Sequence, residues 1–173
     1  MDRLMEIENS EKEESGEQIM LKAPAGISVD HISFRYPDGK GWIFNDFSYD
    51  FKPGSRTAIV GETGIGKSTL IRLILSLLKP NGGEIRIYNE SESRVTSALT
   101  RNNLVYVPQG NTLFSGTVRE NLLMGDPEAD DRQMWAGLDV AEAGFVRSLP
   151  GGLDARIGEI GAGLSEGQAQ RIA

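Results

Sequence analysis

The chain has 173 residues, the size of a single domain, and its 39% apolar and 25% charged residues are ordinary for a globular protein that buries a core. Its formal charge of −7 comes with no basic cluster, which argues against nucleic-acid binding because such binding depends on neutralising phosphates with Lys and Arg. The absence of cysteine excludes disulfides and thiolate metal sites. No apolar run approaches the ~20 residues that span a bilayer, so we do not expect this chain to be an integral membrane protein by itself.

Residues 1–24 form a polar and acidic leader. The first 25 residues contain seven acidic and three basic side chains, and they lack a sustained apolar period. We therefore predict that residues 1 to about 22 are extended or disordered, and that only Ile19, Met20 and Leu21 dock locally.

Several short segments have the pattern of β-strands. Apolar and polar residues alternate over residues 32–36 and again over 47–51, which predicts two half-buried strands. The turn-forming residues 37–41 lie between them, so we expect an antiparallel hairpin. Further strands are predicted from the apolar runs 57–60, 84–88 and 104–107, the first of them buried, whereas segment 89–103 has no clear assignment.

A glycine-rich stretch makes the most specific chemical demand in the chain. It reads Gly61-Glu62-Thr63-Gly64-Ile65-Gly66-Lys67-Ser68-Thr69. The stretch lies between the predicted strand 57–60 and an apolar run that predicts a helix, which is the context that a phosphate loop requires. Its glycines let backbone N–H groups close around an anion and permit positive φ angles, and the helix N-terminus points unpaired N–H groups at the same place. Lys67 then supplies charge for the β- and γ-phosphates, and the Ser68 hydroxyl suits Mg²⁺; a glycine-rich turn without a ligand is the alternative.

The second half of the chain has helical signals. The helix after the loop is apolar on nearly every side to about residue 78, which predicts burial, and segment 79–83 ends it. Thr117 and Glu120 have the spacing of a capping box, and residues 130–143 have apolar positions at helical spacing. With strands first and helices later, we predict an α/β fold with a helical insertion.

Residues 164–171 carry the motif that points to a family. They read Leu164-Ser165-Glu166-Gly167-Gln168-Ala169-Gln170-Arg171. Ser165 and Gln168 have the spacing of a capping box, which predicts that a helix begins here and offers an anion site at its N-terminus. This segment resembles the signature of the nucleotide-binding domain of ATP-binding cassette (ABC) proteins, Leu-Ser-Gly-Gly-Gln followed by x-Gln-Arg. Other segments are similar to exporter-type members in particular, in the family's motif order: Tyr36 before a Pro-Asp-Gly turn, Val107-Pro108-Gln109, residues 113–122 and Ile157-Gly158-Glu159.

The resemblance implies a fold and a division of the chain. It implies an α/β fold with a P-loop NTPase (RecA-like) core, an antiparallel β-subdomain and a helical subdomain. Residues 1–24 then correspond to a linker from an upstream transmembrane domain, and 25–173 to part of an ABC ATP-binding domain. We expect the β-subdomain and phosphate loop over about 25–109 and the helical subdomain over about 110–173.

The resemblance also implies the ligands, ATP and Mg²⁺, and the residues that hold them. Binding of ATP is implied for Tyr36, which stacks on adenine, for the loop residues 61–69, and for Ser165, Gly167 and Gln168 of a second domain paired head to tail. Ser68 and Gln109 are implied as metal ligands, and Gln109 as a catalytic residue. Other interpretations remain open: Tyr36 as the last inward residue of its strand, Gln109 as an ordinary loop residue, and Glu159 as a solvated side chain.

Three features depart from the family pattern. Glu166 replaces the first glycine of the signature; an acid at the first position of a helix is favourable, by ~0.3 to 1 kcal/mol, but it is unfavourable beside a triphosphate. His31, the only histidine, does not match the family's switch histidine, and we expect it at the surface. The chain ends at Ala173, before the family's Asp-Glu strand and switch histidine. The C-terminal part of the core is therefore predicted to be missing, so the 173-residue piece should aggregate or expose apolar surface, and it should hydrolyse ATP poorly.

The leading hypothesis is an ATPase domain that powers export by an ABC transporter. Its expected partners are a second nucleotide-binding domain and the transmembrane domains of an exporter, at the cytoplasmic face of the cell membrane, with no nucleic acid. One alternative is a soluble ABC-type ATPase that acts on nucleic acid or the ribosome, and another is a non-catalytic nucleotide-binding fragment.

Overall fold

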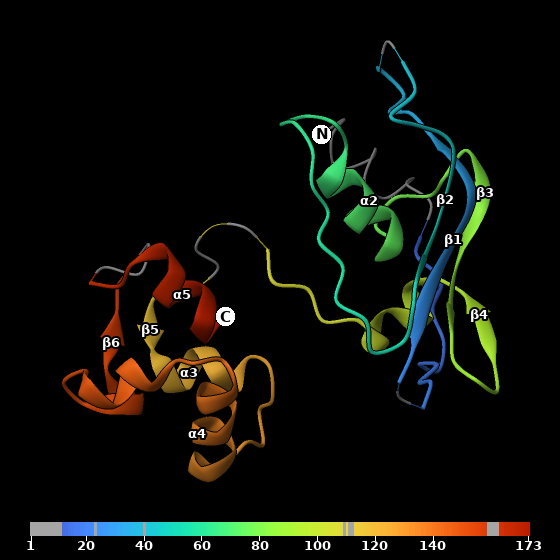
Figure 1. Cartoon of the computed structure of the whole chain (residues 1–173). Coiled ribbons are helices and arrows are strands. Elements are labelled where there is room, and N and C mark those ends of the chain that lie inside the picture. Colours follow the sequence, from blue (N-terminus) through green and yellow to red (C-terminus); the bar gives the residue numbers. More distant parts are fainter. Residues whose placement is uncertain (1–11, 23, 40, 109, 111–112, 159–162) are drawn as a thin grey trace, which may run out of the picture. The chain divides into compact units, whose positions relative to one another are not determined.

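The chain divides into two compact units (Figure 1). The computed structural model describes residues 12–22, 24–39, 41–108, 110, 113–158 and 163–173. Unit 1 extends to Val105 and unit 2 begins at Tyr106. This boundary lies near residues 109–110, where the sequence predicts the helical subdomain to begin.

Unit 1 is built on an antiparallel sheet with the order β2-β1-β3-β4. Its strands are β1 (Gly26–Phe34), β2 (Phe44–Phe51), β3 (Gly82–Tyr88) and β4 (Ser93–Val95). Ile27 of β1 lies opposite Phe51 of β2 and Ile87 of β3. The predicted hairpin is confirmed, but β1 begins before residue 32 and ends before Tyr36.

The helix α2 (Lys67–Ile74) covers one face of this sheet. The core of unit 1 combines residues of the helix and of β1 and β3: Val29, Ile32, Phe34, Leu70, Leu73, Ile74 and Ile85. The predicted extension of the helix to about residue 78 is wrong. Ser76 adopts a left-handed φ of 54°, and the N–H of Leu77 donates to the carbonyl of Arg72 at 2.9 Å, which closes the helix end.

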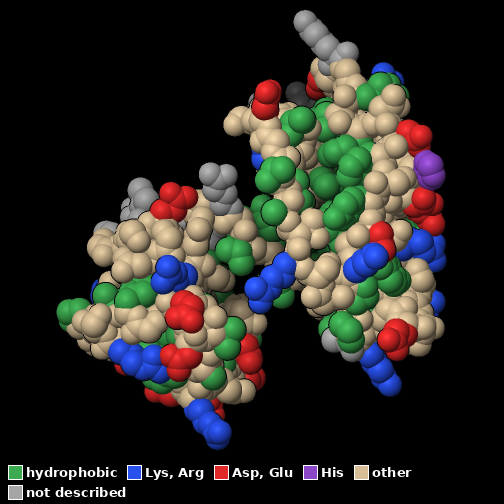
Figure 2. All heavy atoms as spheres, in the orientation of Figure 1, with side chains coloured by type: hydrophobic (Ala, Val, Ile, Leu, Met, Phe, Trp, Pro, Cys, Tyr) green, Lys and Arg blue, Asp and Glu red, His purple; other side chains and the backbone are tan. Residues whose placement is uncertain are grey.

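Two predicted strands are wrong in this structure. Segments 57–60 and 104–107 have no strand geometry, and they expose apolar side chains, with Val60 86% and Val105 96% accessible. A strand exists only by pairing with a neighbour, and within the described ranges no strand pairs with either segment. Figure 2 shows apolar side chains gathered on the visible face of unit 1. The predicted exposure of apolar surface is thus present, whereas aggregation stays a prediction.

The remaining parts of unit 1 are the unassigned segment and the leader. Segment 89–103 contains β4 and the 3₁₀-helix η1 (Ala98–Asn103). Residues 12–22 contain no helix or strand, and Leu21 is buried. Met20 is exposed, so its predicted docking is wrong. The predictions for residues 1–11 lie outside the described residues.

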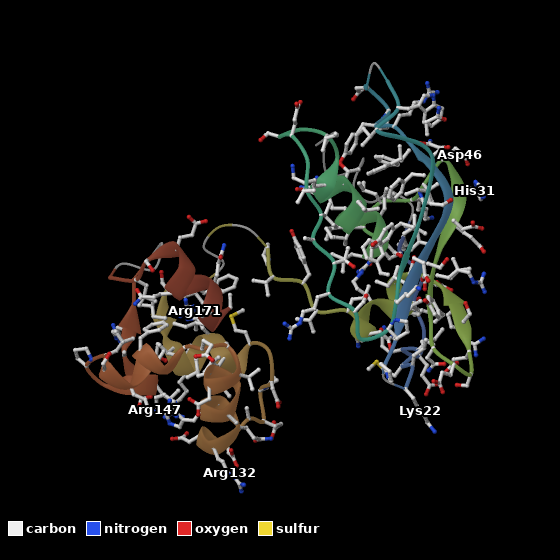
Figure 3. All side chains as sticks on the ribbon, in the orientation of Figure 1. Lys22, His31, Asp46, Arg132, Arg147 and Arg171 are labelled. Atoms are coloured by element: carbon white, nitrogen blue, oxygen red, sulfur yellow. The ribbon has the colours of Figure 1, made fainter. Side chains whose placement is uncertain are left out.

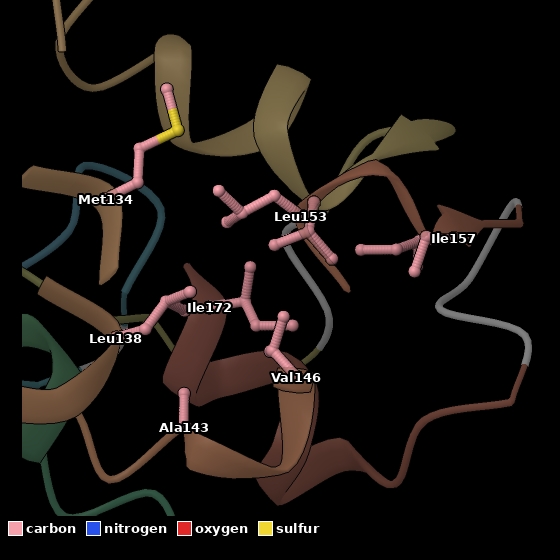
Figure 4. Packing of buried hydrophobic residues seen from close by; sticks show 9 residues of the cluster. Met134, Leu138, Ala143, Val146, Leu153, Ile157 and Ile172 are labelled. Atoms are coloured by element: carbon pink, nitrogen blue, oxygen red, sulfur yellow. The ribbon is translucent and has the colours of Figure 1, made fainter. Parts of the chain in front are cut away.

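Unit 2 is mainly helical around a small core. Its elements are β5 (Gly116–Thr117), α3 (Val118–Leu123), α4 (Asp131–Val140), η2 (Gly144–Ser148), η3 (Gly152–Asp154), β6 (Arg156–Ile157) and α5 (Glu166–Ile172). Figure 4 shows residues of α4, η2 and α5, with Leu153 of η3 and Ile157 of β6, converging on this core. The predicted helix over 130–143 ends at Val140, because Glu142 adopts a left-handed φ of 55°.

Two contacts stabilise unit 2 at its surface and at a helix start. The predicted capping box of α3 is confirmed, since the N–H of Glu120 donates to Thr117 Oγ1 at 3.0 Å and the N–H of Thr117 donates to Glu120 Oε2 at 2.7 Å. Arg119 of α3 bridges Asp131 of α4 and Asp154 of η3.

None of the helices in the described ranges combines the length and the apolar character that crossing a bilayer requires.

Candidate nucleotide-binding site

The loop 61–66 has the backbone conformation that the sequence predicts. Gly61, Gly64 and Gly66 have φ angles of 153°, 88° and 110°, which favour glycine. A Cβ atom on Gly66 would lie 2.5 Å from Ile43 Cγ2 and 3.3 Å from Phe44 Cζ. The loop therefore rests directly against the start of β2, and only glycine fits at its last position.

The amide groups of the loop are available to an anion. Helix α2 begins at Lys67 with Gly66 as N-cap, and no side chain caps it. For the N–H groups of Gly64, Gly66, Lys67 and Ser68, no hydrogen-bond acceptor is found in the described parts of the chain. Unpaired N–H groups at the positive end of a helix are an anion-binding arrangement, so the loop fits the phosphates of a nucleotide.

Lys67 folds back over the same loop. Its Nζ donates to the carbonyl oxygens of Gly61 and Glu62, each at 2.7 Å. These two bonds hold the ammonium at the mouth of the loop. A polyphosphate would take over some of these donors, because an anionic acceptor forms a stronger hydrogen bond than a neutral carbonyl.

Tyr36 lies beside the helix that follows the loop. Its ring meets that of Phe34 edge to face, with 5.1 Å between centroids, and its hydroxyl lies 3.3 Å from Thr69 Oγ1 of α2. This hydrogen bond is the main reason that the pKa of Tyr36 lies below its ordinary value. The structure thus brings Tyr36 together with the loop, and it also packs Tyr36 on the strand core, so both interpretations made from the sequence remain open.

The structure describes one of the two predicted magnesium ligands. Ser68 is exposed at the second residue of α2, whereas Gln109 lies outside the described residues. Among the described residues, no three His, Cys, Asp or Glu side chains are grouped so that they could hold a metal. A single hydroxyl still fits Mg²⁺, because this ion keeps several waters and takes further ligands from nucleotide phosphates.

The signature residues belong to unit 2, whereas the loop and Tyr36 belong to unit 1. The Ser165 hydroxyl accepts from the N–H of Gln168 at 3.2 Å, and Gln168 Oε1 accepts from the N–H of Ser165 at 2.9 Å, which confirms the predicted capping box of α5. Gly167 is exposed, and a Cβ built on it meets no atom within 4 Å, so a partner surface could approach closely. Glu166 is the exposed first residue of the helix, and Glu159 lies outside the described residues.

The single histidine is at the surface, as predicted, with a partner that the sequence analysis missed. Figure 3 shows His31 and Asp46 next to each other, and Asp46 Oδ1 lies 2.5 Å from His31 Nδ1. This hydrogen bond is the largest cause that raises the pKa of His31. Both residues adopt positive φ angles, near the irregularities in the pairing of β1 and β2, which no local sequence pattern announces.

A glycine loop that leads into the N-terminus of a helix and carries a lysine at its mouth is typical of P-loop nucleotide-binding proteins. The family model described as ABC transporter matches residues 44–173. The chain therefore belongs to the ABC transporter family, and the predicted α/β fold class is confirmed.

Three similar proteins are of the exporter or transporter type. A Staphylococcus aureus protein named as a multidrug export ATP-binding/permease protein is 40% identical over 147 residues, which is 84% of this chain and 25% of that protein. An ATP-binding cassette transporter of Schizosaccharomyces pombe is 40% identical over 147 residues, or 83% of this chain and 10% of that protein. A solved structure of a bacterial Atm1-family ABC exporter with ATP bound matches with a TM-score of 0.81 and 28% identity, over 99% of this chain and 31% of that one. This chain thus spans a quarter or less of the two curated relatives.

Proposed function

We propose that this chain is the ATP-binding part of an ABC exporter and that it binds Mg-ATP through residues 61–69. The observation that carries the proposal is the loop itself, with N–H groups at the start of α2 that have no partner among the described residues, and with the Lys67 ammonium at its mouth. Similarity to an exporter structure with ATP bound supports the nucleotide, and the exporter relatives support the process.

Each residue has a distinct role in this proposal. The loop amides and Lys67 hold the phosphates, Ser68 is a ligand of Mg²⁺, and Tyr36 packs on the adenine. Bound Mg²⁺ would neutralise charge on the β- and γ-phosphates. Gln109 contributes at the γ-phosphate, as a metal ligand and catalytic residue.

The proposed partners are a second nucleotide-binding domain and exporter transmembrane domains at the cytoplasmic face of the membrane. In this arrangement the Ser165 end of α5 on one copy completes the phosphate site of the other. The exposed Gly167 supports such an approach, because its surroundings are open. The exposed Glu166 places a negative charge there, and we propose that its carboxylate turns away from the triphosphate.

The test of binding is a titration of the 173-residue chain with Mg-ATP by isothermal calorimetry. Lys67→Ala should raise the dissociation constant by about tenfold or more, the equivalent of about 1.4 kcal/mol. Lys52→Ala is the matched control, since Lys52 is an exposed lysine in the turn after β2, and it should change nothing. Equal affinities for the wild type and Lys67→Ala would contradict the proposal.

A second comparison separates the two interpretations of Tyr36. Tyr36→Ala should weaken ATP but not inorganic triphosphate, whereas Tyr36→Phe keeps the ring and should bind ATP nearly as tightly as the wild type. If Tyr36 only completes the core, Tyr36→Ala should weaken both ligands alike.

For the isolated 173-residue chain we propose binding with little turnover. The only histidine in the sequence is His31, which pairs with Asp46 on the sheet and is not available to read a γ-phosphate. Phosphate release should stay at the buffer rate. Release well above that rate, abolished by Lys67→Ala, would contradict this part of the proposal. The alternative of a soluble ATPase acting on nucleic acid predicts salt-dependent binding of nucleic acid, which the net charge of −7 disfavours.

A further inference from the structure

Arg101 connects three parts of unit 1 that are distant in sequence. It lies in η1, and its Nε donates to the carbonyl of Leu75 at 2.9 Å, while Nη2 donates to the carbonyl of Ser76 at 3.3 Å. The same guanidinium forms a two-pronged ion pair with Glu13 of the leader, at 2.9 and 3.3 Å. Arg101 therefore contacts the C-terminal end of α2 and the leader together.

The two ends of α2 are stabilised differently. At the N-terminal end, which forms the phosphate site, Gly66 provides no side-chain cap. At the C-terminal end, Arg101 places a positive charge against the carbonyls of Leu75, the C-cap residue, and of Ser76 after it, which is favourable for the helix dipole. A helix of eight residues is too short to be stable alone, so a change at one end affects the other.

The leader is attached to the same element that carries Arg101. The N–H of Ile19 donates to the carbonyl of Leu99 at 2.8 Å, and the N–H of Leu21 donates to Asn103 Oδ1 at 2.7 Å. Asn103 Nδ2 returns a bond to the carbonyl of Ile19 at 2.6 Å. The leader and the end of α2 thus share η1 as their support.

η1 itself is held firmly in place. Thr100 is 1% exposed, and its Oγ1 accepts from the N–H of Ser97 at 2.9 Å. In contrast, a cavity of about 400 Å³ lies between residues 12–14 of the leader, the end of α2 and β3. At that end the leader contacts η1 through the Glu13–Arg101 ion pair and not through tight apolar packing.

We propose that Arg101 is a positioning residue for the phosphate loop, and that docking of the leader on η1 and Arg101 strengthens nucleotide binding at the opposite end of α2. The inference rests on the proposed nucleotide binding at residues 61–69. In an exporter the leader would follow the membrane domain, so a movement of that domain that pulls Glu13 from Arg101 would loosen α2 and its hold on the phosphates.

The first test measures Mg-ATP affinity of the 173-residue chain and its variants. Arg101→Ala should raise the dissociation constant roughly threefold to tenfold, on the scale of a charge lost from a helix terminus. Arg101→Lys keeps the charge but not the forked arrangement of donors, so its dissociation constant should lie between those of the wild type and Arg101→Ala. Glu13→Gln should raise the constant about twofold, since an exposed ion pair contributes little. Glu14→Gln is the control, because Glu14 is exposed beside Glu13 and no ion pair is found for it among the described residues.

The second test uses the reciprocity of coupling. If leader docking strengthens nucleotide binding, nucleotide must strengthen leader docking by the same factor. Mg-ATP should therefore slow amide hydrogen exchange at Ile19 and Leu21 in the wild type, and not in Lys67→Ala. A purely structural role of Arg101 would leave these leader amides unchanged by nucleotide.

The outcomes separate this inference from the proposed function. If the wild type does not bind Mg-ATP, the proposed function fails and the coupling fails with it. If the wild type binds, Lys67→Ala does not, and both Arg101→Ala and the leader amides show no effect, only the coupling is overturned. If Arg101→Ala does not fold, Glu13→Gln and the exchange of the wild-type leader amides decide the question.

Discussion

Replacing Gly66 by alanine tests how the phosphate loop is held. In Gly66→Ala the new residue would have to adopt a φ near 110°, which is strained for any side chain, at a cost of about 1 to 3 kcal/mol. Its Cβ would also lie 2.5 Å from Ile43 Cγ2 and 3.3 Å from Phe44 Cζ, so β2 or the loop must move, at a further cost of about 1 to 3 kcal/mol. We expect a loss of about 2 to 6 kcal/mol in the free energy of unfolding of unit 1.

Gly64→Ala is the matched comparison. Its φ of 88° also disfavours a side chain, but a Cβ there meets no atom within 4 Å, so only the backbone strain remains. The difference between the two variants therefore measures the clash with Ile43. In the double variant with Ile43→Ala, the Gly66→Ala substitution should cost at least about 1 kcal/mol less than it does alone, because the clashing methyl group is gone.

The assay is urea unfolding without nucleotide, followed by Trp42 fluorescence. Trp42 and Trp135 are the two tryptophans, one in each unit, so Trp135→Phe is introduced into every variant to make the signal report on unit 1. The denaturant slope should stay the same, and only the midpoint should move. If Gly66→Ala costs no more than Gly64→Ala, the contact between the loop and Ile43 does not exist in solution and the reasoning is refuted.

Three further predictions concern packing, capping and charge. Ile32→Ala should destabilise unit 1 by about 2 to 5 kcal/mol in urea unfolding, because this side chain is completely buried. Thr117→Ala should cost unit 2 about 1 kcal/mol by losing the N-cap of α3, measured by thermal melting, whereas Thr117→Ser should keep the cap. Hydrogen bonds from Arg119 lower the pKa of Asp131 and Asp154, so their stabilisation is present above the unfolded pKa and is lost as the pH falls through the folded values. The melting temperature of unit 2 should thus fall on acidification, and Arg119→Gln should reduce that dependence.

Features that depend on a few neighbouring residues could be predicted from the sequence. The capping boxes at Thr117 and Ser165 were predicted because each needs only two side chains three residues apart, and the structure confirms both. The glycine conformations of the loop could be predicted for the same reason, since positive φ angles follow from the spacing of the glycines and the helix start.

Features that depend on distant segments could not be predicted. An apolar run such as 57–60 or 104–107 forms a strand only if another segment pairs with it. The residues of the run do not reveal whether such a partner is present. The left-handed conformation of Ser76, which ends α2, could not be predicted from the sequence, because serine rarely adopts it. The contact of Arg101 with Glu13 joins residues 88 positions apart, which no periodic pattern can reveal.

The phosphate loop is supported by parts of unit 1 other than the segment that precedes it. The loop keeps its glycine conformations although the segment before it is not a strand and exposes Val60. Its support must therefore come from elsewhere in unit 1. The contacts that reach the loop and α2 come from the region joining β1 and β2, where Ile43 adjoins Gly66 and Tyr36 bonds Thr69, and from Arg101 at the other end of the helix. In this chain the region joining β1 and β2 supports the anion-binding end of α2, and η1 supports the opposite end, whereas the segment before the loop is not a strand.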